Sequence, residues 1–346
     1  MKSIGTASLA IALLSGLGFA QEISFKVKVI DAETRSPLTN ATVRAGFQHR
    51  TYSWKEGIKS EPKFGKTADD GTVDFRGDTN CGEVHCTVKG LDGYYKPRPV
   101  TLYGDKGKCE GVAVNMIRFF VPERWTVTND VRIVMRKVGH PIPLKAKSVR
   151  RWSADGLYPS GTNTLAYDLM VGDWLPPLGK GTFADVELVH RRIDRGEGVL
   201  YDGSETRRIW RAEVEMRFPG DGNGLVGYVS DPSETLRVRT APESGYRPSH
   251  LIWAEKDRNL RYRSSEDRNR SFAFRIRSRH DERGRLVSCH YGKIYGDFKV
   301  GCWLREGGCS VEFLYYLNPT PLDRNLEWDM RNNLCPDPGS LGERRP

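Results

Sequence analysis

Arginines recur at every second position in three stretches of the C-terminal half of this 346-residue chain. They are Arg237 and Arg239, Arg261 and Arg263, and Arg275, Arg277 and Arg279. Because side chains alternate across an extended strand, each set is predicted to project from one face of a sheet. Guanidinium groups match carboxylates, sulfates and phosphates bidentately, so neighbouring strands of this kind would form a cationic binding surface. The alternative is a solvated outer face whose charge is balanced by nearby acidic residues.

A second set of candidate groups is a cluster of carboxylates near the C-terminus, formed by Asp323, Glu327 and Asp329. Paired carboxylates are the simplest machinery for hydrolysing a glycosidic bond, although Arg324 could equally pair with them structurally. His290 could act as a base, but its neighbour Cys289 is better explained as half of a disulfide. The sequence lacks the G-x-S-x-G, H-E-x-x-H, P-loop and dinucleotide-binding patterns, so no cofactor is expected.

Seven cysteines fall into two groups along the chain. They are Cys81, Cys86 and Cys109, then Cys289, Cys302, Cys309 and Cys335. In an oxidising compartment disulfides are the default interpretation, and the second group could form two bridges in any of three connectivities. The first group is odd, so one thiol stays free or bonds across domains. Together with His85 the first group could suggest a metal site, but the C-x-x-C knuckle typical of zinc is missing, and we predict no metal.

Aromatic side chains are the candidates for contact with sugars, because planar rings stack on sugar faces. Trp174 lies in a Gly-Asp-Trp loop that is followed by Pro176 and Pro177, and this constrained loop could expose the indole. Large aromatics on the apolar side of an alternating strand are more often core residues, and Trp210 is predicted to be one of them.

The elements that must position these groups are β-strands. In residues 23–29, Phe25, Val27 and Val29 alternate with polar side chains, which is typical of a strand with one buried face. The same period of two resumes at residues 43–47 and again at 72–75, after an Asp-Asp-Gly turn. These units predict a small antiparallel sandwich.

Four segments of this region carry a family resemblance: VKVIDAETRSPLTNATV, KTADDGTVDF, KGLDGYYKP and VRIVMRKV. On these segments, residues from about 23 to 137 resemble the transthyretin-like β-sandwich of carboxypeptidase regulatory-like domains. The resemblance implies an accessory or cell-surface module, which usually carries no active site of its own.

The second half of the chain is also rich in predicted strands. The clearest is the run from Trp210 to Phe218, in which apolar and charged residues alternate before a Pro-Gly-Asp-Gly-Asn-Gly turn. Further segments of this kind follow at 225–229, 272–276 and 311–317, which predicts a second antiparallel sandwich or jelly-roll-like domain. The expected fold class is therefore all-β.

The domain organisation follows from shifts in composition. Lys2, an apolar run and a small residue at Ala20 have the layout of a signal peptide cleaved near Ala20. Residues 141–162 begin with two prolines within three residues and continue with a basic run, which indicates a linker or, alternatively, a strap along the first sandwich. The predicted segments are a signal peptide at 1–20, a sandwich at 21–140, this linker at 141–162, a second β-rich domain at 163–335 and a disordered tail at 336–346.

The net charge and the signal-peptide pattern together limit the classes of function that the protein could have. The formal net charge is +10, which favours contact with anionic surfaces or polymers. The sequence predicts a secreted, periplasmic or cell-surface protein whose mature chain has no transmembrane segment. It favours a non-catalytic binding protein that contacts an anionic polysaccharide or a cell-envelope component. The alternative is a glycan-active hydrolase that uses the C-terminal carboxylates, and nucleic acid is not an expected partner because no recognition motif is visible.

Overall fold

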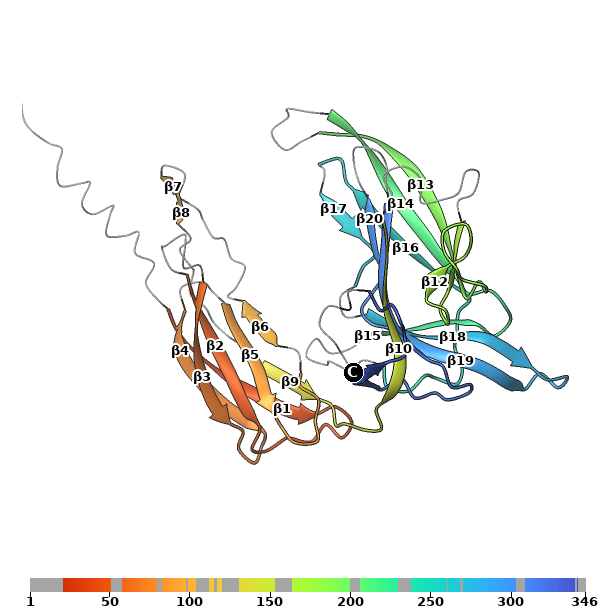
Figure 1. The fold of residues 1–346 in the computed structure, drawn as a ribbon. Coiled ribbons are helices and arrows are strands. Elements are labelled where there is room, and N and C mark those ends of the chain that lie inside the picture. Colours follow the sequence, from red (N-terminus) through yellow and green to blue (C-terminus); the bar gives the residue numbers. More distant parts are fainter. Residues whose placement is uncertain are drawn as a thin grey trace, which may run out of the picture. The chain divides into compact units, whose positions relative to one another are not determined.

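The regular structure of the protein is entirely β within the part of the chain that the computed structural model describes (Figure 1). That part comprises residues 21–50, 58–79, 83–97, 99–103, 112–114, 117–119, 131–152, 164–199, 206–229, 238–259, 261–267, 270–302, 309–339 and 341. The predicted fold class is confirmed. The predicted signal peptide at 1–20 lies outside the described residues. None of the described elements is a helix long and apolar enough to pass through a membrane.

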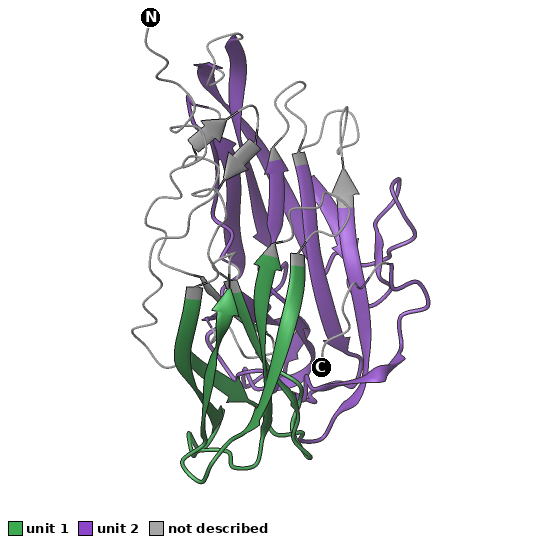
Figure 2. Cartoon of the chain, turned by 90° about the vertical axis from the view of Figure 1, so that its left-hand side faces the viewer, with its two compact units in different colours: residues 1–138, 231–235 green, residues 139–230, 236–346 purple. Residues whose placement is uncertain are grey.

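The chain divides into two compact units (Figure 2). Unit 1 comprises residues 1–138 and 231–235, and unit 2 comprises residues 139–230 and 236–346. Each unit has its own hydrophobic core and its own sheets, and each is described separately below.

Unit 1 contains two facing sheets. In the three-stranded sheet, β1 (Gln21–Asp31) lies between β4 (Thr72–Thr79), which is antiparallel to it, and β9 (Val131–Met135), which is parallel. The four-stranded sheet has the order β3-β2-β5-β6. Its strands are β2 (Thr42–Arg50), β3 (Ile58–Lys66), β5 (Glu83–Gly90) and β6 (Val100–Tyr103). A short separate hairpin is formed by β7 (Val112–Val114) and β8 (Ile117–Phe119).

The inward side chains of both sheets form one core, as the alternation in the sequence predicts. Phe25 from β1 and Phe47 from β2 meet with ring centroids 6.1 Å apart, and both are buried. Gly77 on β4 has no side chain because a Cβ there would lie 2.7 Å from the Phe47 ring. Burial of these alternating residues is the main term that stabilises unit 1, at ~25 cal/mol for each Å² of apolar surface removed from water.

Unit 2 is a second sandwich built from a six-stranded and a seven-stranded sheet. The six-stranded sheet has the order β12-β11-β13-β14-β16-β17. Its strands are β11 (Thr164–Asp168), β12 (Asp173–Trp174), β13 (Val186–Val199), β14 (Thr206–Arg217), β16 (Ser249–Lys256) and β17 (Tyr262–Ser264). The strand predicted from Trp210 onward is therefore the second half of β14.

The seven-stranded sheet has the order β15-β18-β19-β21-β10-β22, with β20 also paired to β21. Its strands are β10 (Ile142–Trp152), β15 (Gly224–Val229), β18 (Arg270–His280), β19 (Leu286–Ile294), β20 (Lys299–Cys302), β21 (Cys309–Asn318) and β22 (Trp328–Asn333). One face of this sheet packs against the six-stranded sheet around Phe274, Phe313 and Met216. Its other face is covered by smaller clusters around Tyr291 and Trp328.

Two segments differ from the domain plan that the sequence predicts. Residues 142–152, predicted as part of a linker or strap, form β10, which pairs with β21 and β22 inside unit 2. Pro143 is accommodated because the β10–β22 ladder shifts register between Ile142 and Leu144, where no strand hydrogen bond is required of it. The predicted disordered tail is partly ordered, since the Ser148 N–H donates to the Pro338 carbonyl.

Candidate functional site

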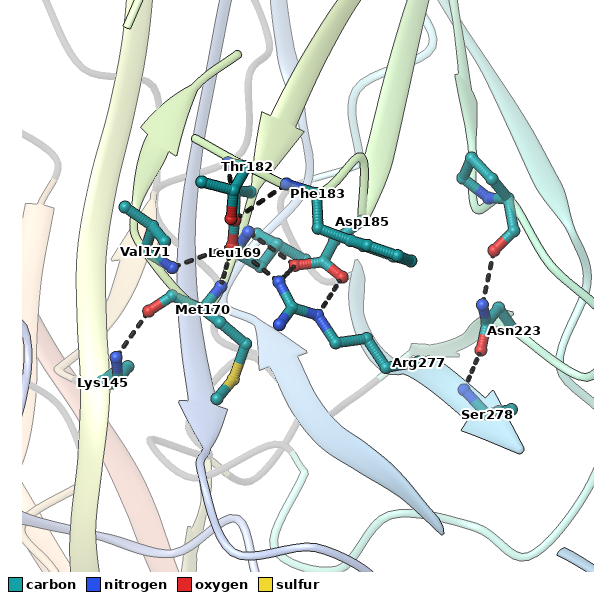
Figure 3. Close-up of polar contacts among 12 residues, drawn as sticks. Lys145, Leu169, Met170, Val171, Thr182, Phe183, Asp185, Asn223, Arg277 and Ser278 are labelled. Atoms are coloured by element: carbon teal, nitrogen blue, oxygen red, sulfur yellow. Dashed lines mark hydrogen bonds and ion pairs between the residues drawn. The ribbon is translucent and has the colours of Figure 1, made fainter. Parts of the chain in front are cut away.

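The alternating arginines do not form the predicted wall, because the strand that carries three of them changes its period. Arg277 on β18 has a left-handed backbone, with φ of 52°, and the β18–β19 register shifts between Ile276 and Arg279. Such a bulge turns the following side chains to the opposite face of the sheet. Arg275 therefore lies on the outer face beside Tyr246, whereas Arg277 reaches two aspartates of unit 2 (Figure 3).

Arg277 forms a buried ion network with Asp168 and Asp185 (Figure 3). Its Nε donates to Asp185 Oδ1 at 2.8 Å, and its Nη2 donates to Asp168 Oδ1 at 2.8 Å. The Asp168 carboxylate also accepts backbone N–H groups from Met170, Val171, Thr182 and Phe183. These hydrogen bonds hold both ends of the loop between β11 and β13 in place.

The two aspartates of this network titrate in opposite directions. Burial tends to raise the pKa of Asp168, but the hydrogen bonds from Val171 and Thr182 and the charge of Arg277 outweigh it, so its pKa is lowered. Burial dominates for Asp185, whose pKa is raised even though Arg277 opposes the change. Both carboxylates are almost fully buried and their oxygens are occupied by protein donors. The network is therefore a structural anchor.

The other predicted arginines are dispersed. Arg275 donates to the Gly222 carbonyl, and Arg239 pairs with Glu327. Arg263 lies on β17, in the other sheet of unit 2, and pairs with Asp257, while Arg261 is exposed just before that strand. Arg279 is exposed near the end of β18, and Arg237 lies outside the described residues.

Trp174 is buried, which corrects the prediction of an exposed indole. Its relative exposure is 8%, and its ring packs edge-on against Tyr167 at 4.8 Å. The Asp173 carboxylate accepts the Trp174 N–H, so the turn directs the indole into the core of unit 2.

The three C-terminal carboxylates stabilise their own surroundings. Asp323 accepts the Asn325 N–H and the Asn318 side-chain amide, and Asp329 accepts the backbone N–H of the residues two and three positions later. Glu327 is buried. Its carboxylate accepts a hydrogen bond from the Gly139 N–H at 2.8 Å and pairs with the Arg239 guanidinium. The three carboxylates therefore hold turns and neighbouring backbone in place. This arrangement gives no support to a catalytic acid–base pair.

A buried lysine that the sequence does not single out lies near Glu327. Lys293 on β19 is 2% exposed, and its Nζ lies 5.2 Å from the centre of the Tyr316 ring. Burial lowers the pKa of Lys293 to about 7, and the negative charge of Glu327 limits this effect. Lys293 lies in the packed layer that covers the outer face of the seven-stranded sheet. Its lowered pKa therefore affects the stability of the fold.

Three cysteines have free, buried thiols: Cys86, Cys289 and Cys335. For Cys289 and Cys335 the prediction of disulfides is wrong, whereas a free Cys86 is compatible with the odd first group. Cys86 and Cys289 are packed into hydrophobic clusters, and the Cys335 thiol donates to the Asp337 carbonyl. Burial raises the pKa of Cys86 to about 12 and also raises that of Cys289, which makes them unreactive. The side chains of Cys81, Cys109, Cys302 and Cys309 lie outside the described residues. Among the described residues no cluster of His, Cys, Asp and Glu could hold a metal ion.

The most conspicuous exposed aromatic in the described part of unit 1 is Phe64 on the edge strand β3. Its side chain is 58% exposed. Its cross-strand partner is Arg44 on β2, and directly opposite residues of an antiparallel pair share one face. On the opposite face of β2, Val43 and Phe47 are fully buried in the core. Phe64 and Arg44 therefore belong to the outer face of the four-stranded sheet.

Two lysines complete the surroundings of this ring. Lys89 Nζ lies 5.9 Å from the centre of the Phe64 ring, and Lys66 is the partner of Thr42 on the same face. Lys89 lies on this face because its neighbour Val88 points into the core and side chains alternate along β5. It has no opposite residue on β2, because the β2–β5 ladder shifts register between Thr42 and Val43. We refer to Phe64, Arg44, Lys66 and Lys89 as the Phe64 platform.

No carboxylate lies on this face at the positions paired in the described ladders of β2 with β3 and β5. Those positions are Thr42, Arg44, Gly46, Gln48, Ser60, Pro62, Phe64, Lys66, His85 and Thr87. A charged sheet face normally mixes both signs for solubility, so it is unusual that the charged residues at these paired positions carry no negative charge. This face could not be predicted from apolar alternation, because β3, IKSEPKFGK, has none, although a phenylalanine between lysines was a visible signal.

The fold and this site define a class of protein: an all-β chain of two sandwich units that presents a cationic face around an exposed ring. No known protein family, curated protein or solved structure matches the chain.

Proposed function

We propose that the protein is an exported, non-catalytic binding protein whose unit 1 contacts an anionic saccharide through the Phe64 platform. The observation that carries this proposal is an aromatic ring 58% exposed on a sheet face that bears cations and no paired carboxylate. The ring offers an apolar plane for the C–H face of a sugar. Arg44 and Lys89 supply the charges for a carboxylate or sulfate on that sugar. Export is proposed on the signal-peptide pattern of residues 1–20.

We also propose that unit 1 is a sandwich of the carboxypeptidase regulatory-like type. The pairing of β1 with β4 and β9, opposite a four-stranded sheet, supports this proposal. A domain of this kind fits a binding role, because its surface presents side chains from rigid strands. The hydrolase alternative gains no support, since Asp323, Glu327 and Asp329 are each engaged by neighbouring donors.

The test is binding of an oligogalacturonate to the full chain, measured by titration calorimetry. The same oligomer with its carboxyl groups reduced to alcohols is the neutral reference ligand. We expect binding of the acidic oligomer that weakens with salt, because exposed charges are screened within about 10 Å at 0.1 M ionic strength. Phe64→Ser should weaken binding about tenfold, or ~1.4 kcal/mol, which matches the worth of one stacked ring.

Three further variants separate the platform from general effects of charge and exposed rings. Lys89→Gln should weaken binding, whereas Lys180→Gln, at an exposed lysine of unit 2, should not. Tyr262→Ser removes a ring that is 51% exposed in unit 2 and should also leave binding unchanged. Equal binding of the acidic and reduced oligomers, with no effect of Phe64→Ser, would refute the proposal.

A further inference from the structure

The turn that connects β1 to β2 carries a modification motif that the Phe64 platform does not use. Asn40, Ala41 and Thr42 form an Asn-x-Thr triplet whose middle residue is not proline. Such a triplet is the acceptor pattern for N-linked glycosylation, and an acceptor asparagine lies on an accessible surface loop of an exported protein. A glycan at Asn40 requires that its carboxamide is open to solvent and is not needed by the fold.

Thr67, the residue after β3, holds the backbone of this turn. Its carbonyl accepts the Asn40 N–H at 2.9 Å, and its N–H donates to the Ala41 carbonyl at 3.1 Å. Its hydroxyl accepts the Ala41 N–H at 2.9 Å and donates to the Leu38 carbonyl at 2.7 Å. The turn is thus held without the Asn40 side chain, whose carboxamide has no hydrogen-bond partner within the described part of the chain.

Both polar groups of the triplet are open to a modifying enzyme. The Asn40 side chain is exposed, and so is that of Thr39 beside it. The Asn40 backbone is left-handed, with φ of 58°, but aspartate or glycine would also suit this conformation, so the conformation alone does not explain an amide here. Thr42 is partly exposed on the outer face of the four-stranded sheet, and its hydroxyl has no partner among the described residues.

The other Asn-x-Ser and Asn-x-Thr triplets of the chain lack this setting. The triplet at 318–320 has Pro319 in the middle, which excludes it as an acceptor. The triplet at 269–271 has a permitted composition, but Ser271 is 1% exposed on β18 and its hydroxyl is buried. Asn269 itself lies outside the described residues. The structural argument therefore concerns Asn40.

We propose that Asn40 carries an N-linked glycan, which a transferase supplies from a lipid-linked oligosaccharyl pyrophosphate. Asn40 Nδ2 forms a bond to C1 of the first sugar and gives up one proton. The bond from C1 to the pyrophosphate oxygen breaks, and the lipid pyrophosphate leaves with its electron pair. This substitution at C1 needs no oxidant or reductant. The inference rests on the export that forms part of the proposed function, because the transfer takes place in the secretory pathway.

The experiment maps the modification on the full chain secreted from a eukaryotic host. Trypsin releases residues 36–44 as one peptide that contains Asn40, because Arg35 and Arg44 are its cleavage sites. Peptide N-glycosidase converts a glycan-bearing asparagine to aspartate, so mass spectrometry should find this peptide with aspartate at position 40 only after enzyme treatment. The mature N-terminus in the same sample should be Gln21, as expected for cleavage after Ala20.

Three variants of the turn test whether the triplet is what the transferase recognises. Thr42→Val keeps a β-branched side chain at the start of β2 and should abolish the modification, whereas Thr42→Ser keeps a hydroxyl and should retain it. Thr39→Val is the matched control, because it removes the hydroxyl of an exposed threonine in the same turn and should leave Asn40 modified. A melting curve verifies that each variant is folded.

The outcomes separate this inference from the proposals of export and of the Phe64 platform. A chain secreted from Gln21 onward with an unmodified Asn40 would overturn the glycan and leave export intact. A chain retained in the cell with residues 1–20 attached would refute export and the glycan together. Modification that persists in Thr42→Val would overturn the assignment to this triplet. Phe64→Ser should leave the modification unchanged, so the platform stands or fails in its own binding measurement.

Discussion

Replacing Lys293 with methionine should stabilise the protein, and the gain should depend on pH. Lys293 is 2% exposed and its pKa is lowered to about 7, mainly by burial. An unfolded chain keeps a lysine near its ordinary pKa of about 10.4. The unfolded state therefore binds the proton more tightly, and the folded state is penalised wherever that proton is present.

The magnitude follows from the difference between the two pKa values. Each tenfold change in proton affinity is worth ~1.36 kcal/mol, so the full penalty below about pH 7 is about 5 kcal/mol. Methionine removes this penalty and fills a similar volume. It also removes the attraction to Glu327, which retains Arg239 and the Gly139 N–H as partners. Replacing buried ion pairs with apolar side chains of similar volume is often neutral or stabilising by about 1–4 kcal/mol, and the low pKa of Lys293 places this substitution among the stabilising ones.

The sign of the pH dependence is the critical part of this prediction. The folded pKa of Lys293 is depressed, so the penalty is complete below about pH 7 and disappears as the pH rises towards about 10.4. Urea unfolding of the wild type and of Lys293→Met should therefore show the largest difference at about pH 6 and a much smaller one at about pH 10. Lys180→Met, at an exposed lysine, is the control. A difference that does not change with pH, or a methionine variant that is less stable at about pH 6, would refute the reasoning.

The remaining predictions concern the buried ion contacts of unit 2. Arg277→Ala should lower the free energy of unfolding by about 3–5 kcal/mol, because it leaves two buried aspartates without their cation; Arg277→Lys should restore little of this, since lysine lacks the planar fork. Chemical denaturation measures both, and a loss below about 1 kcal/mol for the alanine variant would argue that the network is not an anchor. Gly139→Ala should destabilise unit 2 by about 1–3 kcal/mol, because a Cβ there would lie 1.4 Å from Arg239 Nη2 and 2.6 Å from Glu327 Oε2. A melting temperature equal to that of the wild type would contradict this clamp geometry.

The alternation of apolar and polar residues was sufficient to predict the strands that have one apolar face. Phe25, Val27 and Val29 face the core of unit 1, and the run beginning at Trp210 is the second half of β14. A period of two is a local property of the sequence, so it can be recognised without knowing which strands pair with each other. It failed at Arg277 because a single left-handed residue reverses the faces of the strand, and nothing in the local pattern marks that residue.

Partner strands that are distant in sequence explain the other differences. The prolines near residue 142 indicated a linker, yet β10 is a strand because β21 and β22 pair with it. The segment of β21 was predicted as a strand, but its pairing with a segment so distant in sequence was not visible from composition. The Phe64 platform likewise forms only when β2, β3 and β5 align, since Arg44 and Lys89 are brought to Phe64 by register. The sequence shows which side chains are present. Which of them share one face of a sheet depends on the register between strands, and the sequence does not show that register.

The Glu327 clamp on Gly139 and His140 has a consequence for the order in which the protein folds. The first residues of unit 2 are held by a side chain that is synthesised 188 residues after Gly139, and β10 pairs with strands that begin at residues 309 and 328. Closing so long a loop costs entropy before any contact repays it, which slows folding. The described strands of unit 1 all come before residue 139, so its sandwich can form during synthesis. The β10 segment of unit 2 stays unpaired until β21 and β22 have been synthesised. During this interval its unpaired strand edges make misfolding and aggregation most favourable.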